Sequence, residues 1–595
     1  MKRIPLTLLL ALLILAGCST PATDAEKKEN QTAQTLVADH RSKQADAAQS
    51  LDQQQSPQPP PPSPAAEAMS NRAGSIAKKT SGAIGRTAVY DAMPSSPPVS
   101  AWNRESYNAD QENGFVNAGR DPLSTFSIDV DTASYANVRR FVNGGNLPPK
   151  GAIRIEEMIN YFSYDYPAPK HGEPFGLSVE VGPSPFHRDY QLARIGLAAK
   201  DLAKEQLPAS NLVFLVDVSG SMQDANKLPL LKLALPLLVR QLGERDRVSL
   251  VVYAGGDRVV LPPTPGNRQQ EILAAIEQLQ AGGSTHASGG LRAAYELARQ
   301  GFMASGNNRV ILASDGDFNV GVTSRDELQR LIEKERQGGI YLTVLGFGMG
   351  NYHDDTMEIL ADKGNGNYAY IDNLLEAKKV LVKELSGTLF TLANDVKIQV
   401  EFNSARVGAY RLIGYENRVL ADEDFRDDRK DAGEIGVGHR VTALYELIPA
   451  GHGAIPELDP LKYQQPKKGA SHSSQELMTV KLRYKPLQAT RSQLITLAVP
   501  EAPNVRPSAD FRFAAAVAGY GMLLSGSEHL GSFTWEQCLE MARSSRGADT
   551  EGYRAELSRL VETSQMLAQQ RPPQESRPEP PPMARPVPMP KPQLK

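Results

Sequence analysis

The architecture of this chain follows from ten residues, Leu212-Val213-Phe214-Leu215-Val216-Asp217-Val218-Ser219-Gly220-Ser221. An unbroken run of large apolar residues is typical of a strand that is covered on both faces, as in a parallel sheet. The run ends abruptly in an aspartate and two serines, so we expect the strand to carry polar side chains to the carboxyl edge of a sheet. Open α/β sheets bind their ligands at that edge.

The sequence that follows alternates between strand and helix patterns. Further apolar runs occur at Arg247–Tyr253, Arg309–Ala313 and Ile340–Leu345. Helical periodicity lies between the runs, at Leu228–Leu242, Gln269–Leu279, Ala287–Met303 and Arg325–Glu335. This alternation predicts an α/β domain over residues 211–390, with a doubly wound, mainly parallel sheet and helices on both faces.

Three short polar motifs occur in this domain, two of them at predicted strand ends. They are Asp217-Val218-Ser219-Gly220-Ser221, Gly282-Gly283-Ser284-Thr285 and Ala313-Ser314-Asp315-Gly316. One such motif is weak evidence, because Asp and Ser are common in turns. All three in this order resemble the metal-ion-dependent adhesion site of von Willebrand factor A (VWFA) domains. That resemblance implies a set of five metal ligands: Asp217, Ser219, Ser221, Thr285 and Asp315.

The chemistry of these side chains agrees with the resemblance. Carboxylates, hydroxyls and water are hard oxygen donors that suit octahedral Mg²⁺, or Mn²⁺, and the lack of Cys and His ligands disfavours zinc. Two carboxylates only neutralise the ion, so an open coordination position can accept an Asp or Glu carboxylate from a protein partner, which is how the family binds proteins. Ser219 and Ser221 also stand where they could cap the following helix.

The N-terminus has the pattern of a processing signal over residues 1–17. Lys2 and Arg3 precede the apolar segment Ile4–Leu15, which is too short to span a bilayer. The segment leads into Leu15-Ala16-Gly17-Cys18, which resembles the lipobox of bacterial lipoproteins and implies cleavage before Cys18 and acylation of that residue. The alternative is an ordinary signal peptide with an incidental cysteine. Because Ser19 follows, and not the Asp that commonly signals inner-membrane retention, we expect a lipid-anchored protein of the cell envelope, at the outer membrane more than at the inner.

Two further segments have compositions that disfavour a packed core. Residues 18–100 are rich in Ala, Gln, Ser, Lys and Pro, and residues 571–595 are rich in Pro. Large apolar side chains are too few in both to offset the entropy lost on ordering. We therefore expect a disordered N-terminal tether and a disordered C-terminal tail.

The chain on either side of the α/β domain changes to a two-residue period. Strand patterns occur at Phe175–Val181, Tyr190–Leu197, Val396–Phe402, Val441–Ile448, Met478–Tyr484 and Leu494–Val499. They predict β strands over 166–210 and 391–503, with the α/β domain inserted into one β-sandwich, although two separate sheets are also compatible. Shorter helical patterns predict helical regions over 101–165 and 504–570.

These flanks resemble bacterial von Willebrand factor A lipoproteins of the YfbK type. The matching segments are Pro122–Asp131, Arg154–Phe162 and Tyr410–Arg418. The resemblance extends roughly from Asn103 to Gln569. The C-terminal region of that family has no established activity, so the resemblance implies architecture more than a role.

Charge and motif content disfavour several other functions. Sixty-five Lys and Arg residues against 68 Asp and Glu residues give a net charge of −3, which argues against a basic field that would hold nucleic acid. No nucleophile elbow, Walker A loop or dinucleotide fingerprint occurs in a suitable context. Residues 315–319 begin like an EF-hand loop, but Val320 stands where that loop requires glycine.

We therefore expect an envelope lipoprotein that binds a protein through a magnesium-bridged carboxylate. The alternative is a structural envelope tether whose metal only holds the loops together, and the long proline-rich linker favours that alternative. An enzyme is the least supported class, because no catalytic set of residues accompanies the metal motifs.

Overall fold

The computed structural model describes residues 105, 107, 111–128, 131–283, 287–316, 325–348, 354–430, 432–456, 475–487, 489–501 and 506–570. The predicted signal peptide, tether and tail lie outside the described residues, and so do Cys18 and Thr285. The elements described below belong to one unit of the chain, Pro97–Lys595.

The apolar run 212–216 lies in strand β5 (Ser210–Asp217), which is buried along its whole length. β5 pairs in parallel with β6 (Arg247–Tyr253) on one side and with β8 (Asn307–Ser314) on the other. The central sheet has the order β10-β9-β8-β5-β6-β7. Its other strands are β7 (Asp257–Pro265), β9 (Ile340–Phe347) and β10 (Tyr368–Ile371). Only the pairing of β6 with β7 is antiparallel, so the predicted mainly parallel sheet is confirmed.

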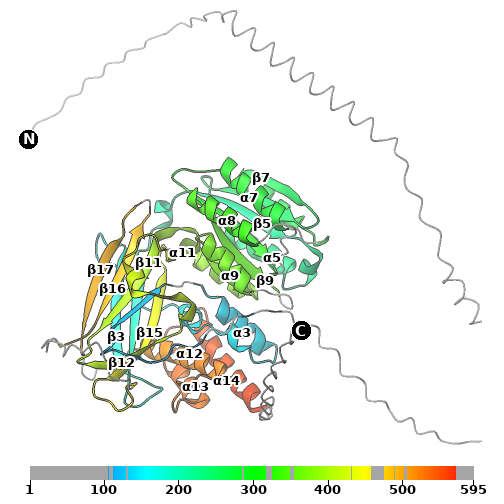
Figure 1. Ribbon diagram of the computed structural model, residues 1–595. Coiled ribbons are helices and arrows are strands. Elements are labelled where there is room, and N and C mark those ends of the chain that lie inside the picture. Colours follow the sequence, from blue (N-terminus) through cyan, green and yellow to red (C-terminus); the bar gives the residue numbers. More distant parts are fainter. Residues whose placement is uncertain are drawn as a thin grey trace, which may run out of the picture. The chain divides into compact units, whose positions relative to one another are not determined.

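Helices cover both faces of the central sheet because each strand places alternate side chains on opposite faces. Leu212, Phe214 and Val216 point into one core, and Val213 and Leu215 into the other. The first core is closed by α5 (Leu228–Val239) and α6 (Gln269–Glu277), the second by α7 (Ala287–Gln300), α8 (Arg325–Gln337) and α9 (Asp354–Lys363) (Figure 1). The domain ends with α10 (Leu374–Lys378), a π-helical turn (Lys379–Lys383) and α11 (Leu385–Leu389).

Strands from both sides of this domain pair with each other. In the first sandwich sheet, with the order β1-β12-β15-β4-β3, β4 (Gln191–Ala199) precedes the domain and pairs with β15 (Arg440–Pro449), which follows it. In the second sandwich sheet, with the order β13-β2-β11-β16-β17, β2 (Leu123–Ser127) pairs with β11 (Thr391–Phe402) in the same way. The other strands are β1 (Val116–Asn117), β3 (Phe175–Pro183), β12 (Val407–Ile413), β13 (Val419–Leu420), β14 (Gly433–Gly436), β16 (Glu476–Pro486) and β17 (Gln493–Pro500). The expected pairing across the insertion is confirmed, and both sheets contribute to one core.

A third core holds helices from the two ends of the described chain. α3 (Ala133–Asn143) and α4 (Ile155–Asn160) pack with α12 (Ala509–Ser525), α13 (Trp535–Ser544) and α14 (Tyr553–Gln570). Figure 1 shows α12, α13 and α14 side by side, with α3 next to them. The region 101–165 was predicted to be helical, but it also supplies β1 and β2. These strands are too short to show a clear period, and their neighbours in the sheets come from residues far along the chain.

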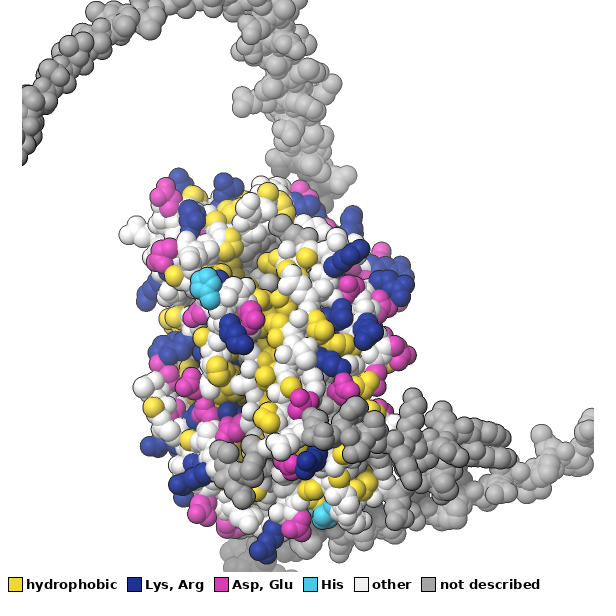
Figure 2. Space-filling view, turned by 90° about the vertical axis from the view of Figure 1, so that its left-hand side faces the viewer, with side chains coloured by type: hydrophobic (Ala, Val, Ile, Leu, Met, Phe, Trp, Pro, Cys, Tyr) yellow, Lys and Arg dark blue, Asp and Glu magenta, His cyan; other side chains and the backbone are white. Residues whose placement is uncertain are grey.

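The edge strand β17 carries apolar side chains on its outer side. From Leu494 to Pro500 exposed residues alternate with half-buried or buried ones, and Leu494 is 51% exposed. Figure 2 shows the face of the molecule on which β17 lies, which is the left-hand side of Figure 1. Hydrophobic side chains gather in the middle of this face, and charged side chains lie on either side of them. Among the described helices, none combines the length and the apolar character needed to cross a bilayer.

Candidate metal centre

Two buried carboxylates lie at the carboxyl edge of the central sheet. Asp217 is the last residue of β5, and Asp315 directly follows β8. Because β5 and β8 are neighbouring parallel strands, both residues reach the same edge, where ligands of such sheets bind. Their exposed fractions are 0% and 2%, so both charges are removed from water.

The Asp217 carboxylate accepts hydrogen bonds from three directions. Oδ1 accepts from the backbone N–H of Ser219 at 2.8 Å, and Oδ2 accepts from the hydroxyls of Tyr253 and Ser314, each at 3.2 Å. Burial raises the pKa of Asp217 to about 6. The hydrogen bonds from Ser219 act to lower this pKa, and the nearby charge of Asp315 acts to raise it further. A carboxylate whose charged form is disfavoured in this way gains from a cation close by.

The two motif serines face each other. Their hydroxyl oxygens are 3.0 Å apart, and Ser219 is almost fully buried. The prediction that these serines cap a helix was wrong, because the 3-10 helix Gly220–Gln223 shows no side-chain cap and α5 begins only at Leu228. The 3-10 helix and a turn separate the serines from α5. The Ser219 hydroxyl hydrogen-bonds to Asp217, and the Ser221 hydroxyl lies beside that of Ser219.

The loop that leads to Thr285 lies against the Asp217 loop. The backbone N–H of Gly220 donates to the carbonyl of Gly283 at 3.0 Å, and that of Gly282 donates to the carbonyl of Val218 at 2.7 Å. Of the predicted ligands, Asp217, Ser219, Ser221 and Asp315 are described and come together at this edge. Thr285 lies outside the described residues, and its role stays a prediction.

Sequence reasoning missed two groups that complete the site. Tyr253 ends β6, whose register with β5 places it opposite Asp217, so the parallel-strand pattern could have indicated it. Lys227 directs its ammonium group at Asp315, with Nζ 2.9 Å from Oδ2. A single lysine before a helix has no motif that would have revealed this contact.

The donor set fits a hard divalent cation. Among the described residues, no group of three or more His, Cys, Asp or Glu side chains could hold a metal ion. An ion at this edge would therefore rely on Asp217 and Asp315 together with hydroxyl oxygens, the ligands that suit Mg²⁺ or Mn²⁺.

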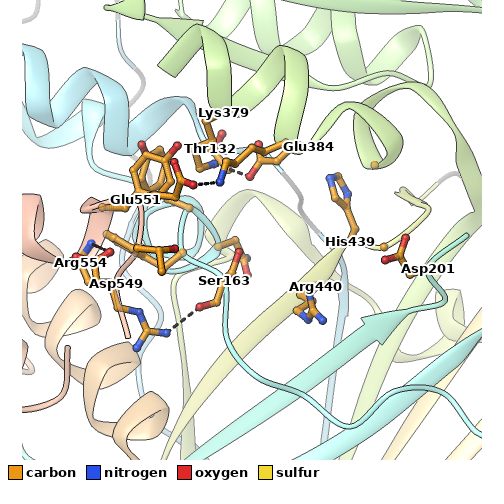
Figure 3. A pocket seen from close by; sticks show the side chains of 18 of the residues that line it. Thr132, Ser163, Asp201, Lys379, Glu384, His439, Arg440, Asp549, Glu551 and Arg554 are labelled. Atoms are coloured by element: carbon orange, nitrogen blue, oxygen red, sulfur yellow. Dashed lines mark hydrogen bonds and ion pairs between the residues drawn. The ribbon is translucent and has the colours of Figure 1, made fainter. Parts of the chain in front are cut away.

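A second candidate is a cavity of about 540 Å³ lined by the π-helical turn, the segment 160–163, the loop 437–440 and the segment 548–554. Figure 3 shows Asp201, His439 and Arg440 grouped in one part of it and the remaining labelled side chains in another. Burial, and secondarily the charge of Lys379, lowers the pKa of His439 to about 4, so the ring is neutral near pH 7.

Four of the charged groups of this cavity form two ion pairs with one another. Lys379 Nζ lies 2.6 Å from Glu384 Oε1, and Lys383 pairs with Glu551. Arg554 donates to the backbone carbonyl of Ser163 at 2.8 Å. The carboxyl edge of the central sheet, where four of the five predicted ligand residues come together, is the better candidate.

Comparison with known proteins assigns family models to most of the described chain. The "von Willebrand factor type A domain" model matches residues 211–383, and a second "von Willebrand factor" model matches residues 101–194. The model "Uncharacterized protein YfbK, C-terminal" matches residues 387–567. Type A domains mediate protein–protein interactions and typically bind a divalent metal, which agrees with the donor set found here.

The chain is also similar to individual proteins. YfbK of Escherichia coli (strain K12) is 46% identical over 466 residues, which cover 77% of this chain and 80% of the relative. Protein sll0103 of Synechocystis is 31% identical over 31% of this chain and 43% of its own length. Among solved structures, the von Willebrand factor type A protein from Catenulispora acidiphila matches with 15% identity and a TM-score of 0.35, over 62% of this chain and 87% of its own.

Proposed function

The chain belongs to the YfbK family, and from this premise we propose that it is a cell-envelope lipoprotein that binds a protein partner through a divalent metal ion. The observation that carries the proposal is the pair of buried carboxylates, Asp217 and Asp315, beside the facing hydroxyls of Ser219 and Ser221. The ion is Mg²⁺ or Mn²⁺, and the group that completes it is an Asp or Glu carboxylate of the partner.

Each residue of the site has a distinct part in this proposal. Asp217 and Asp315 supply the formal charges that balance the ion, while Ser219, Ser221 and Thr285 supply neutral oxygens. Tyr253 and Ser314 hold Asp217 in place through Oδ2. The metal, when bound, supplies a positive point to which a carboxylate oxygen of the partner can bind.

The envelope location is proposed from the N-terminal sequence. Cys18 is the acylated residue, and the tether over residues 18–100 separates the lipid from the folded part of the chain. Several acyl chains make such an anchor stable, because each buried CH₂ contributes about 0.8 kcal/mol. The outer membrane is favoured over the inner, since Ser19 follows the acylated cysteine.

Substitution of Asp217 tests the function directly. Asp217→Ala removes one of two charged ligands, so metal affinity should fall by more than about 10-fold, and capture of the partner from envelope extract should be lost. Ser219→Ala removes only a neutral oxygen and should weaken metal binding less. The measurements are calorimetric titration with Mg²⁺ or Mn²⁺ and pull-down with the full-length protein, each with and without EDTA.

Circular dichroism and a matched carboxylate variant control the experiment. Asp257→Ala removes an exposed carboxylate at the same edge of the sheet, where Asp257 pairs with Tyr253 in the β6–β7 register, and should change neither assay. If the Asp217→Ala protein is folded and binds magnesium normally, or if capture persists unchanged in EDTA, the carboxylate bridge is refuted. The structural-tether function would then take its place.

A further inference from the structure

Lys227 places a positive charge inside the proposed metal centre. Its Nζ donates to Asp315 Oδ2 at 2.9 Å and to the backbone carbonyl of Ser221 at 2.9 Å. The side chain is only 6% exposed, and that of Asp315 is 1% exposed, so this ion pair is buried. Lys227 thus contacts two of the predicted ligand residues at once.

The residues around Lys227 leave room for its side chain and fix the position of its backbone. Gly348, just after β9, has φ +80°, and a Cβ added there would lie 2.3 Å from Cε of Lys227. The glycine therefore leaves the space through which the lysine stem reaches Asp315. At the other end, Lys227 directly precedes α5, and its backbone carbonyl accepts from the N–H of Leu231 at 2.9 Å.

We propose that Lys227 is an internal competitor for the metal, whose ammonium group balances Asp315 in the metal-free site and must leave that carboxylate before a divalent ion binds. The inference rests on the proposed function, because it concerns the same metal centre. It adds a regulatory feature: the site fills only at divalent-ion concentrations high enough to displace the lysine.

Electrostatics supports competition over cooperation. An ammonium group and a divalent ion repel each other strongly when both are held next to one buried carboxylate. The apparent affinity for metal is then the intrinsic affinity multiplied by the fraction of molecules in which Lys227 has left Asp315. A second acceptor is available to the displaced ammonium group, since Asp224 Oδ2 lies 3.7 Å from Nζ on a side chain that is largely exposed.

A lysine that only braces Asp315 would have the opposite effect. In that case Asp315 would use one oxygen for the lysine and the other for the metal, and loss of the lysine would leave metal affinity unchanged or weaken it. The effect of removing Lys227 on metal affinity therefore separates the two roles.

The test compares Lys227→Met and Lys227→Gln with the parent in the full-length protein. Calorimetric titration with Mn²⁺ should show at least a 10-fold lower Kd for both variants. In EDTA, Lys227→Met should also unfold at a lower temperature than the parent, because Asp315 loses its counter-ion, and saturating Mn²⁺ should remove most of that difference. Gln keeps a hydrogen-bond donor near Asp315, so it retains a usable fold if Met does not.

Control variants separate a failure of the inference about Lys227 from a failure of the proposed metal centre. Lys232→Met removes a lysine of α5 whose ammonium group donates to backbone carbonyls of Glu277 and Leu279, away from the site, and should leave the Kd unchanged. If Asp217→Ala abolishes Mn²⁺ binding while the Lys227 variants bind like the parent or more weakly, the inference fails and the metal centre stands. If neither the parent nor any Lys227 variant binds Mn²⁺, both the inference and the proposed function fail.

Discussion

At the scale of single residues, burial shifts pKa values and so determines whether a side chain is charged near pH 7. His439 shows the effect outside the metal centre: its Nδ1 is buried and has no hydrogen-bond partner among the described residues. The ring as a whole is only partly shielded, because it lines the cavity of Figure 3. Burial lowers the pKa of His439 to about 4, so the folded protein resists protonation there while the unfolded chain accepts a proton near pH 6.5.

This difference predicts a loss of stability in acid. A histidine with a lowered pKa in the folded state favours the unfolded chain as the pH falls from about 6.5 toward 4. Between about pH 7 and about pH 4.5, the parent should lose about 2 kcal/mol more of its free energy of unfolding than His439→Gln does, after allowance for partial exposure of the ring. Urea denaturation at both pH values measures it.

The control for this prediction is His171→Gln, which alters an exposed histidine and should follow the parent. Equal acid sensitivity of the parent and His439→Gln would show that other groups cause the loss.

At the scale of one element, α5 contains a residue that opposes its own helix. Pro236 lies inside α5, between the buried residues Leu235 and Leu238. Proline lacks the N–H that would donate to the carbonyl of residue 232, and its ring crowds that carbonyl. α5 nevertheless buries an apolar face against the central sheet, and this packing outweighs the local cost. The helix ends soon after, at Val239, and not at Leu242 as predicted.

Pro236→Ala should therefore stabilise the protein. Proline in a helix interior costs about 3 kcal/mol relative to alanine, and part of that gain is offset because alanine makes the unfolded chain more flexible. We expect a gain of about 2 kcal/mol in the free energy of unfolding, measured by chemical denaturation in EDTA so that metal binding does not contribute. An unchanged or lower stability would mean that the packing around α5 requires the proline ring.

At the scale of the whole molecule, one buried arginine joins the helices from both ends of the described chain to the central domain. Arg139 of α3 pairs with Asp372 and, at 2.7 Å, with Glu376 of α10, both from the central domain. It also lies 3.1 Å from Glu556 of α14 and donates to the hydroxyl of Tyr161 at 3.0 Å. The N-terminal helices, the central domain and the C-terminal helices thus share one ionic cluster.

Removal of Arg139 should be severely destabilising. Arg139→Met leaves Glu376 and Asp372 buried without their counter-ion, and breaking a buried pair in this way costs about 3–5 kcal/mol. Arg543→Met, which disrupts an exposed pair with Glu562, should cost less than about 1 kcal/mol. Chemical denaturation followed by circular dichroism measures both, and a cost for Arg139→Met as small as that for Arg543→Met would contradict the role assigned to the cluster.

The sequence alone determined the features that depend on local pattern. The apolar run before Asp217 indicated a buried parallel strand, and polar residues at the ends of two such runs placed Asp217 and Asp315 at one edge of a sheet. These inferences succeed because strand burial and the polarity of a strand end are both recorded within a few consecutive residues. The resemblance of the flanks to YfbK likewise rested on short contiguous segments.

Only the tertiary structure decided which distant residues meet. β4 precedes the inserted domain and pairs with β15, which follows it, and β2 pairs with β11 in the same way. Lys227 and Asp315 are 88 residues apart in sequence, and Arg139 and Glu556 are 417 apart. No local period carries such contacts, because they arise from the packing of complete elements against one another. The charge balance of the proposed metal centre therefore could be seen only in the folded chain.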